Sequence, residues 1–178
     1  MLEKPKFIIG PDGVRDAGQM EEVVQLANNI GAEDLRGGIF KPRSLPGFWQ
    51  GKGGKDGSAI INKSLRDFPG SFTLETWSAS DTLQFLNQTK DISPTINIQI
   101  GARTGPGNLI QEIGKVVADT NSESKLVVKN SLVPGAKNFV ARVEWALSVL
   151  PTNRVIAVAR GVEPANDLHR FTPNLIDL

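Results

Sequence analysis

Short apolar runs alternate along this chain with longer stretches in which apolar residues recur at every third or fourth position. The short runs are typical of buried strands, and the longer stretches are typical of amphipathic helices. Together they predict six strands interleaved with five helices, with successive strands typically about thirty residues apart, the length of a βα unit. The strands are expected at residues 7–9, 34–36, 72–75, 96–100, 126–128 and 155–158.

Capping residues and glycines indicate where the helices begin and end. Asp16 is expected to cap a first helix, and Gly31 is expected to end it. A long polar loop rich in Gly and Pro is predicted from Gly37 to Gly57. The apolar positions that indicate the helices are Met20, Val23, Val24, Ala27 and Ile30; Ile61, Leu65 and Phe68; Leu83 and Leu86; Leu109 to Val117; and Phe139, Val140, Val143 and Leu147.

Strands that alternate with helices imply an α/β fold with a parallel sheet and right-handed crossovers. Two architectures fit this pattern: an open doubly wound sheet and a (β/α)8 barrel. A full barrel typically needs about 250 residues and eight units, whereas the 178 residues here supply about six. No internal boundary interrupts the pattern, so one domain is expected over residues 1–178.

Composition restricts the expected kinds of binding partner more than it restricts the expected fold. The formal net charge is +1, which gives no reason to expect a nucleic acid or a membrane as partner. The chain has no cysteine, so disulfides and thiolate metal sites are excluded and a reducing compartment is indicated. The first five residues contain no long apolar run typical of a signal peptide, and a cytoplasmic location is expected.

Basic residues follow successive predicted strands, at the ends where both architectures bind ligands. About one residue in nine is basic, so one or two such cations are expected by chance. Positive charges close together at one end of the sheet repel one another unless an anion lies among them. A mixture of Arg and Lys suits a ligand with phosphate and carboxylate groups. The pattern therefore predicts a site for small phosphorylated anions, formed by Arg36, Lys41, Arg43, Arg103, Lys129 and Arg160.

The same segments resemble the 3-deoxy-D-arabino-heptulosonate 7-phosphate (DAHP) synthases and their relatives, the 3-deoxy-octulosonate 8-phosphate synthases. The resemblance extends over essentially the whole chain, and its most specific motifs are Lys-Pro-Arg at 41–43 and Gly-Ala-Arg-Thr at 101–104. Further matching segments are residues 7–11, 35–44, 49–51, 127–130 and 159–161.

The resemblance implies a (β/α)8 TIM-type barrel, incomplete here, with about six βα units present. It also implies an aldol-type condensation of phosphoenolpyruvate with an aldose phosphate, the first step of the shikimate pathway of aromatic amino acid biosynthesis, with Mn, Mg, Fe or Zn as the divalent metal. By motif, phosphoenolpyruvate would be held by Arg36, Lys41, Arg103, Lys129 and Arg160, and the aldose phosphate by Lys41, Pro42, Arg43 and Ser44.

The chain departs from the family at its metal ligands. The family uses a Cys after Gly-Pro on the first strand, where this chain has Asp12, which either ligates a hard cation or forms a turn. The family's Asp-Pro-Ser-His segment on the seventh strand has no counterpart, and the one histidine, His169, is expected at the surface or in a hinge. Metal binding is therefore expected to be weak or absent.

Three hypotheses remain open. The chain is a DAHP synthase in lineage, a non-catalytic protein that keeps the anion pocket, or an interaction module completed by a partner. Exposed edges at the first and sixth strands are expected to pair with another copy or a completing chain, or else to leave the fold with low stability. Trp49 and Gln50 either cover the site or pack within their own loop, and Glu75 either positions a cation or water or pairs with a neighbouring Arg.

Overall fold

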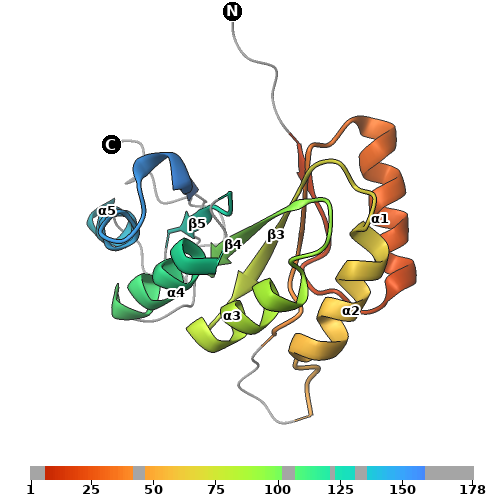
Figure 1. Cartoon of the computed structure of the whole chain (residues 1–178), viewed down its shortest axis with the longest axis horizontal. Helices are drawn as coiled ribbons and strands as arrows, with labels where there is room; N and C mark the ends of the chain where they lie inside the picture. The colour runs from red at the N-terminus through yellow and green to blue at the C-terminus, as the bar shows by residue number, and fades with distance from the viewer. Residues whose placement is uncertain (1–6, 42–46, 102–106, 121–122, 131–135, 159–178) are drawn as a thin grey trace, which may run out of the picture.

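The computed structural model describes residues 7–41, 47–101, 107–120, 123–130 and 136–158. Within these ranges, six strands form one parallel sheet (Figure 1). The strands are β1 (Ile8–Ile9), β2 (Asp34–Gly37), β3 (Ser71–Thr76), β4 (Thr95–Ile100), β5 (Leu126–Lys129) and β6 (Val155–Val158). The helices are α1 (Ala17–Ile30), α2 (Gly53–Leu65), α3 (Ala79–Gln88), α4 (Gly107–Thr120) and α5 (Ala136–Leu147), with a 3₁₀ turn, η1, at Thr152–Arg154.

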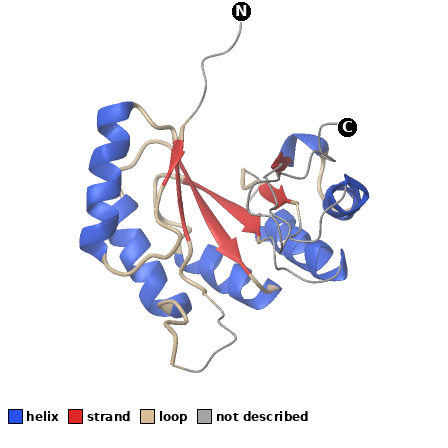
Figure 2. Ribbon diagram, turned by 180° about the vertical axis from the view of Figure 1, so that it is seen from behind, coloured by secondary structure: helices blue, strands red, loops and turns tan. Residues whose placement is uncertain are grey.

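The strand order decides between the two candidate architectures. The strands pair in sequence order from β1 to β6, each parallel to the next. A doubly wound sheet reverses its order at a switch point, whereas this order advances in one direction across the described strands. The five α-helices follow one another in an arc outside the curved sheet (Figures 1 and 2). The fold is a half-barrel of the (β/α)8 type, as the family resemblance implied.

The sheet presents an apolar face to the helices. Phe72 of β3 lies with its ring centroid 6.5 Å from that of Phe85 of α3, and both side chains are fully buried. The residues paired beside Phe72, Leu35 on β2 and Ile96 on β4, join the same core. Because side chains alternate along a strand, the residues between them point into the barrel. The hydrophobic core therefore lies between sheet and helices, and the inner face is free to be polar.

The predicted ends of α1 are confirmed. The Asp16 carboxylate accepts a hydrogen bond from the backbone N–H of Gln19 at 2.8 Å, which satisfies an otherwise unpaired donor of the first turn. Gly31 ends the helix in the left-handed conformation, with φ of 67°, which glycine adopts without a steric penalty.

The predicted loop from Gly37 to Gly57 is too long, because α2 already begins at Gly53. The loop folds back on itself: Phe40 and Gly51 form an antiparallel bridge, and the Gly53 N–H donates to the Ile39 carbonyl at 3.1 Å. Gly57 then lies against Ile39, where a Cβ atom would be 2.5 Å from the Cβ of Ile39. Gly57, which suggested a loop, instead lets α2 approach Ile39 closely.

Several positions expected to be buried are exposed: Phe7, Ile8, Ile30, Leu83, Val140 and Leu147. Ile8 was expected in a buried strand but is 55% exposed, because β1 is only two residues long and pairs with β2 alone among the described strands. Leu83 was expected on the core face of α3 but is 45% exposed. Ser78 caps this helix, and its buried face is formed by Thr82, Phe85 and Leu86.

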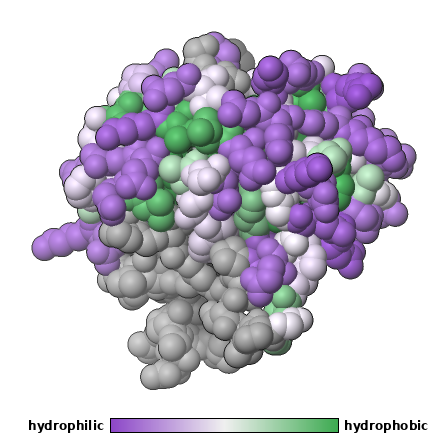
Figure 3. All heavy atoms as spheres, turned by 60° about the horizontal axis from the view of Figure 1, so that its bottom comes forward, coloured by the Kyte–Doolittle hydropathy of each residue, from purple (hydrophilic) through white to green (hydrophobic). Residues whose placement is uncertain are grey.

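Hydrophilic side chains dominate the face of the molecule seen in Figure 3, and apolar side chains occur there in small separate groups. Within the described ranges, every helix is too short or too polar to cross a membrane.

Candidate functional site

A small polar cavity, about 140 Å³ in volume, lies at the carboxyl ends of the strands. This is the edge at which parallel α/β proteins bind their ligands. Its lining comes from the loop after β1, from the four strands that follow and from the loop after β2. The lining residues are Pro11, Asp12, Arg36, Gly37, Gly38, Thr73, Glu75, Gln99 and Lys129.

The polar lining follows from the strand register. Arg36 pairs with Thr73, and Glu75 pairs with Gln99, in rows that alternate with the apolar rows facing the helices. Thr73 and Gln99 are buried yet face the cavity. Neither Thr73 nor Gln99 is among the anion-binding residues that the sequence predicted. Each lies between two apolar residues of its strand, and this alternation was the signal that could have placed them on the inner face.

Lys41 lies beside the cavity and is held by two carboxylates. Its ammonium group donates to Asp12 at 3.0 Å and to Glu75 at 3.2 Å. The side chain of Lys41 is 6% exposed, that of Glu75 is 19% exposed and that of Asp12 is 72% exposed. The sequence left two roles open for Glu75, positioning a cation or water and pairing with a neighbouring Arg, and the contact that the structure gives it is an ion pair with Lys41. Protein carboxylates already compensate part of the positive charge at this site.

Glycines leave room for this arrangement. A Cβ atom on Gly38 would lie 2.6 Å from Cε of Lys41, and one on Gly10 would lie 1.9 Å from the carbonyl oxygen of Arg36. Gly10 also has φ of 148°, which few residues other than glycine adopt. The loop after β1 can approach β2 only because these two positions carry no side chain.

Trp49 packs against the loop after β1. A Cβ atom on Gly13 would lie 2.5 Å from the Trp49 ring and 3.7 Å from Cε of Lys41. The indole therefore packs against Gly13 instead of only within its own loop. Gln50 makes a contact within the loop, because its side-chain amide donates to the Phe48 carbonyl at 3.2 Å.

Three of the predicted anion-binding residues lie in the described part of the chain. Arg36 on β2 and Lys129 on β5 line the cavity, so they come from the first and last of the four strands that border it. Lys41 forms ion pairs with Asp12 and Glu75, two residues of the cavity lining. The other predicted site residues lie outside the described residues: Pro42, Arg43, Ser44, Arg103 and Arg160, together with His169.

The residues described around Asp12 do not fit a divalent metal. The described ranges contain no group of three or more His, Cys, Asp or Glu side chains that could hold an ion. The Asp12 carboxylate lies 3.0 Å from the Lys41 ammonium, whose positive charge would repel a cation.

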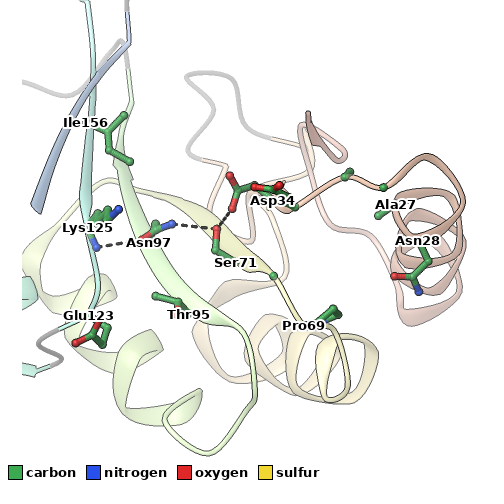
Figure 4. Close-up of a pocket in the computed structure, with 14 residues that line it drawn as sticks. Ala27, Asn28, Asp34, Pro69, Ser71, Thr95, Asn97, Glu123, Lys125 and Ile156 are labelled. Atoms are coloured by element: carbon green, nitrogen blue, oxygen red, sulfur yellow. Dashed lines mark hydrogen bonds between the residues drawn. The ribbon is translucent and has the colours of Figure 1, made fainter. Parts of the chain in front are cut away.

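A larger cavity, about 710 Å³, opens at the amino ends of the strands (Figure 4). Its polar groups bond to one another: the Ser71 hydroxyl donates to Asp34, the Asn97 amide donates to Ser71 at 3.1 Å, and the Lys125 N–H donates to Asn97 at 3.1 Å. Ligands of parallel α/β folds bind at the other end of the strands. The smaller cavity is therefore the better candidate despite its size.

Comparisons with known proteins find similarity to one kind of enzyme. The chain is 24% identical over 173 residues to the phospho-2-dehydro-3-deoxyheptonate aldolase of Thermotoga maritima. A crystal structure of that enzyme, a DAHP synthase, superposes with a TM-score of 0.74 at 22% identity. The resemblance to the DAHP synthases is confirmed. A truncated form of the Thermotoga maritima DAHP synthase superposes with a TM-score of 0.71 at 21% identity.

The likeness to the DAHP synthases extends over nearly all of this chain but only part of the relatives. The alignment with the curated relative covers 97% of this chain and 46% of the relative, so the chain spans about half the relative's length. The two structures are matched over 94% of this chain and over 44% and 56% of their own chains. No protein-family model matches the chain.

Proposed function

We propose that this half-barrel binds phosphoenolpyruvate in the cavity at the carboxyl ends of its strands, in the manner of a DAHP synthase. The observation that carries the proposal is the convergence of Arg36 from β2 and Lys129 from β5 on one small polar cavity. A guanidinium fork matches a phosphate or carboxylate group, and an ammonium group adds a compact charge. The sequence likeness to an aldolase of this kind supports the same ligand.

The reaction proposed for the site is the aldol-type condensation of phosphoenolpyruvate with an aldose phosphate. Cations around the cavity would neutralise the phosphate and carboxylate groups and stabilise the charge that develops as the enol attacks the aldehyde. Residues 41–44 are the proposed contacts of the aldose phosphate, and Arg103 and Arg160 are proposed further contacts of phosphoenolpyruvate. Because the residues around Asp12 do not fit a metal, no step is assigned to one, and Mn²⁺ is expected to bind weakly.

The second candidate function is anion binding without catalysis. The ion pairs that Lys41 makes with Asp12 and Glu75 favour it, because they occupy a cation that the reaction would use. An interaction module completed by a partner chain is the third candidate. It is favoured by β1 and β6, each of which pairs on one side only among the described strands.

Calorimetric titration with phosphoenolpyruvate, with and without Mn²⁺, tests the proposal. Arg36→Ala and Lys129→Ala are each expected to weaken binding by about tenfold or more, because each removes a charged hydrogen-bond donor to the anion. Lys63→Ala is the matched control, since Lys63 lies on α2 in an exposed ion pair with Glu21 and should leave binding unchanged.

The same titration separates the candidates. Wild-type affinity in both Arg36→Ala and Lys129→Ala would remove the pocket assignment. Release of phosphate from phosphoenolpyruvate on addition of erythrose 4-phosphate selects the enzyme. Binding that is independent of Mn²⁺ and proceeds without turnover selects the non-catalytic anion-binding protein.

A further inference from the structure

Arg142 of α5 is a buried arginine that reaches the carboxyl ends of two strands. It is 7% exposed. Its Nε donates to the carbonyl of Lys129 at 2.9 Å, and its Nη2 donates to the carbonyl of Gly101 at 3.0 Å. Lys129 is the last residue of β5, and Gly101 directly follows β4. One guanidinium thus joins two neighbouring strand ends.

These two carbonyls lie where the ladder between the strands stops. The last paired residues of β4 and β5 are Ile100 and Val128, one position before Gly101 and Lys129. A buried backbone carbonyl beyond the ladder needs another donor. A guanidinium offers several N–H groups in one rigid plane, so it can bond both carbonyls and fix the distance between them.

Arg142 does not line the proposed anion cavity, but it bonds to a residue that does. Lys129 lines the proposed anion cavity, whereas Arg142 is absent from its lining. Burial lowers the pKa of Arg142 from its ordinary value, because desolvation disfavours the charged form. An apolar side chain in this place would avoid that cost but would leave the Lys129 and Gly101 carbonyls without these donors.

We propose that Arg142 is a positioning residue, which holds the ends of β4 and β5 at Gly101 and Lys129 so that Lys129 faces the anion cavity. The identity of that anion rests on the proposed function. The holding of the strand ends is a property of the chain alone and can be measured without a ligand.

Arg154 provides a matched control at the other end of the same strand. Its Nε donates to the Ser124 carbonyl at 2.9 Å and its Nη2 to the Val117 carbonyl at 2.9 Å. Arg154 thus joins α4 to the residues before β5 by the same chemistry. Replacing Arg154 should lower the stability of the protein without displacing the carboxyl ends of β4 and β5.

The experiment compares Arg142→Lys, Arg142→Gln and Arg154→Gln. For each variant, phosphoenolpyruvate affinity is measured by calorimetry, and exchange of the Asn130 amide hydrogen is measured without ligand. That amide donates to the Val158 carbonyl at 3.3 Å, next to Lys129. Both Arg142 variants are expected to bind about tenfold more weakly and to exchange the Asn130 hydrogen faster. Arg154→Gln is expected to melt earlier while keeping wild-type affinity and exchange at Asn130.

Arg142→Lys distinguishes geometry from charge, because it keeps the charge but loses the rigid fork. Weakened binding in Arg142→Gln alone would indicate a long-range charge effect and overturn the inference. Unchanged exchange at Asn130 in both Arg142 variants would overturn it as well. If the wild type binds no phosphoenolpyruvate, the proposed function fails. Faster exchange confined to the Arg142 variants would still support the holding role.

Discussion

Lys41 illustrates how a residue predicted for the site from its motif can have an unexpected environment. The sequence placed it among cations that would repel one another without a ligand. In the structure its ammonium group lies between the carboxylates of Asp12 and Glu75. The repulsion is therefore reduced within the protein, and an incoming anion would have to compete with two carboxylates for this lysine.

Replacing Lys41 by methionine tests this arrangement. Lys41→Met is expected to lower the free energy of unfolding by about 1–3 kcal/mol, because it leaves the mostly buried Glu75 without its charged partner. Lys63→Met is the control. Lys63 pairs with Glu21 in solvent, and its loss should change stability by less than about 0.5 kcal/mol. Equal effects in urea unfolding would show that the Lys41 ion pairs contribute no more than a surface pair.

Asn97 makes a second residue-scale test possible. It is 8% exposed and links Ser71 to the backbone of Lys125 inside the barrel. Asn97→Ala is expected to lower the unfolding free energy by about 1–3 kcal/mol, because the part-buried Ser71 hydroxyl and Lys125 N–H lose the partner that Asn97 provides. Asn28→Ala alters an exposed residue of the same cavity and should change it by less than about 0.5 kcal/mol. A similar loss in both variants would contradict a role for the network.

At the scale of elements, the order of helices and strands follows closely from the sequence, whereas the place of a glycine inside a helix does not. Asp16 and Gly31 bound α1 as predicted, because both act on the backbone beside them. Gly57 was assigned to a loop, because local propensity disfavours glycine in a helix. Its place in α2 depends on Ile39, which lies eighteen positions earlier in the chain and packs against it only in the folded protein.

Two glycine-to-alanine substitutions separate propensity from packing. Gly57→Ala is expected to lower the unfolding free energy by about 1–3 kcal/mol, because the new methyl group would overlap Ile39. Gly18→Ala lies at an exposed position of α1 with ordinary contacts, and should raise it by up to about 1 kcal/mol. Thermal unfolding of both variants provides the measurement. Stabilisation by Gly57→Ala would mean that α2 does not approach Ile39 so closely.

At the scale of the whole molecule, the half-barrel leaves edges that can pair. Ile8 on β1 is 55% exposed and Ile156 on β6 is 38% exposed, and each strand pairs on one side only within the described ranges. Open strand edges with apolar side chains favour association with other chains. The predicted association, with another copy or with a completing chain, therefore stays a proposal with a physical basis.

Sedimentation velocity over a range of concentrations tests self-association. The sedimentation coefficient is expected to rise with concentration, and Ile156→Lys is expected to reduce that rise because it places a charge beside the edge of β6. Leu83→Lys, on the exposed face of α3, is the control and should leave association unchanged. A monomer at all concentrations would contradict self-association and leave a different completing chain to be sought.

The sequence by itself determined the order and type of the elements, the ends of α1 and the basic residues at the strand ends. These features depend on periodicity, capping and motifs, which act over a few neighbouring residues. Only the tertiary structure decided the partners of Lys41, the place of Thr73 and Gln99 in the lining of the cavity, and the hydrogen bonds from Arg142 to two strand ends. Each of these joins residues from different βα units, and such contacts exist only once the sheet has set its register.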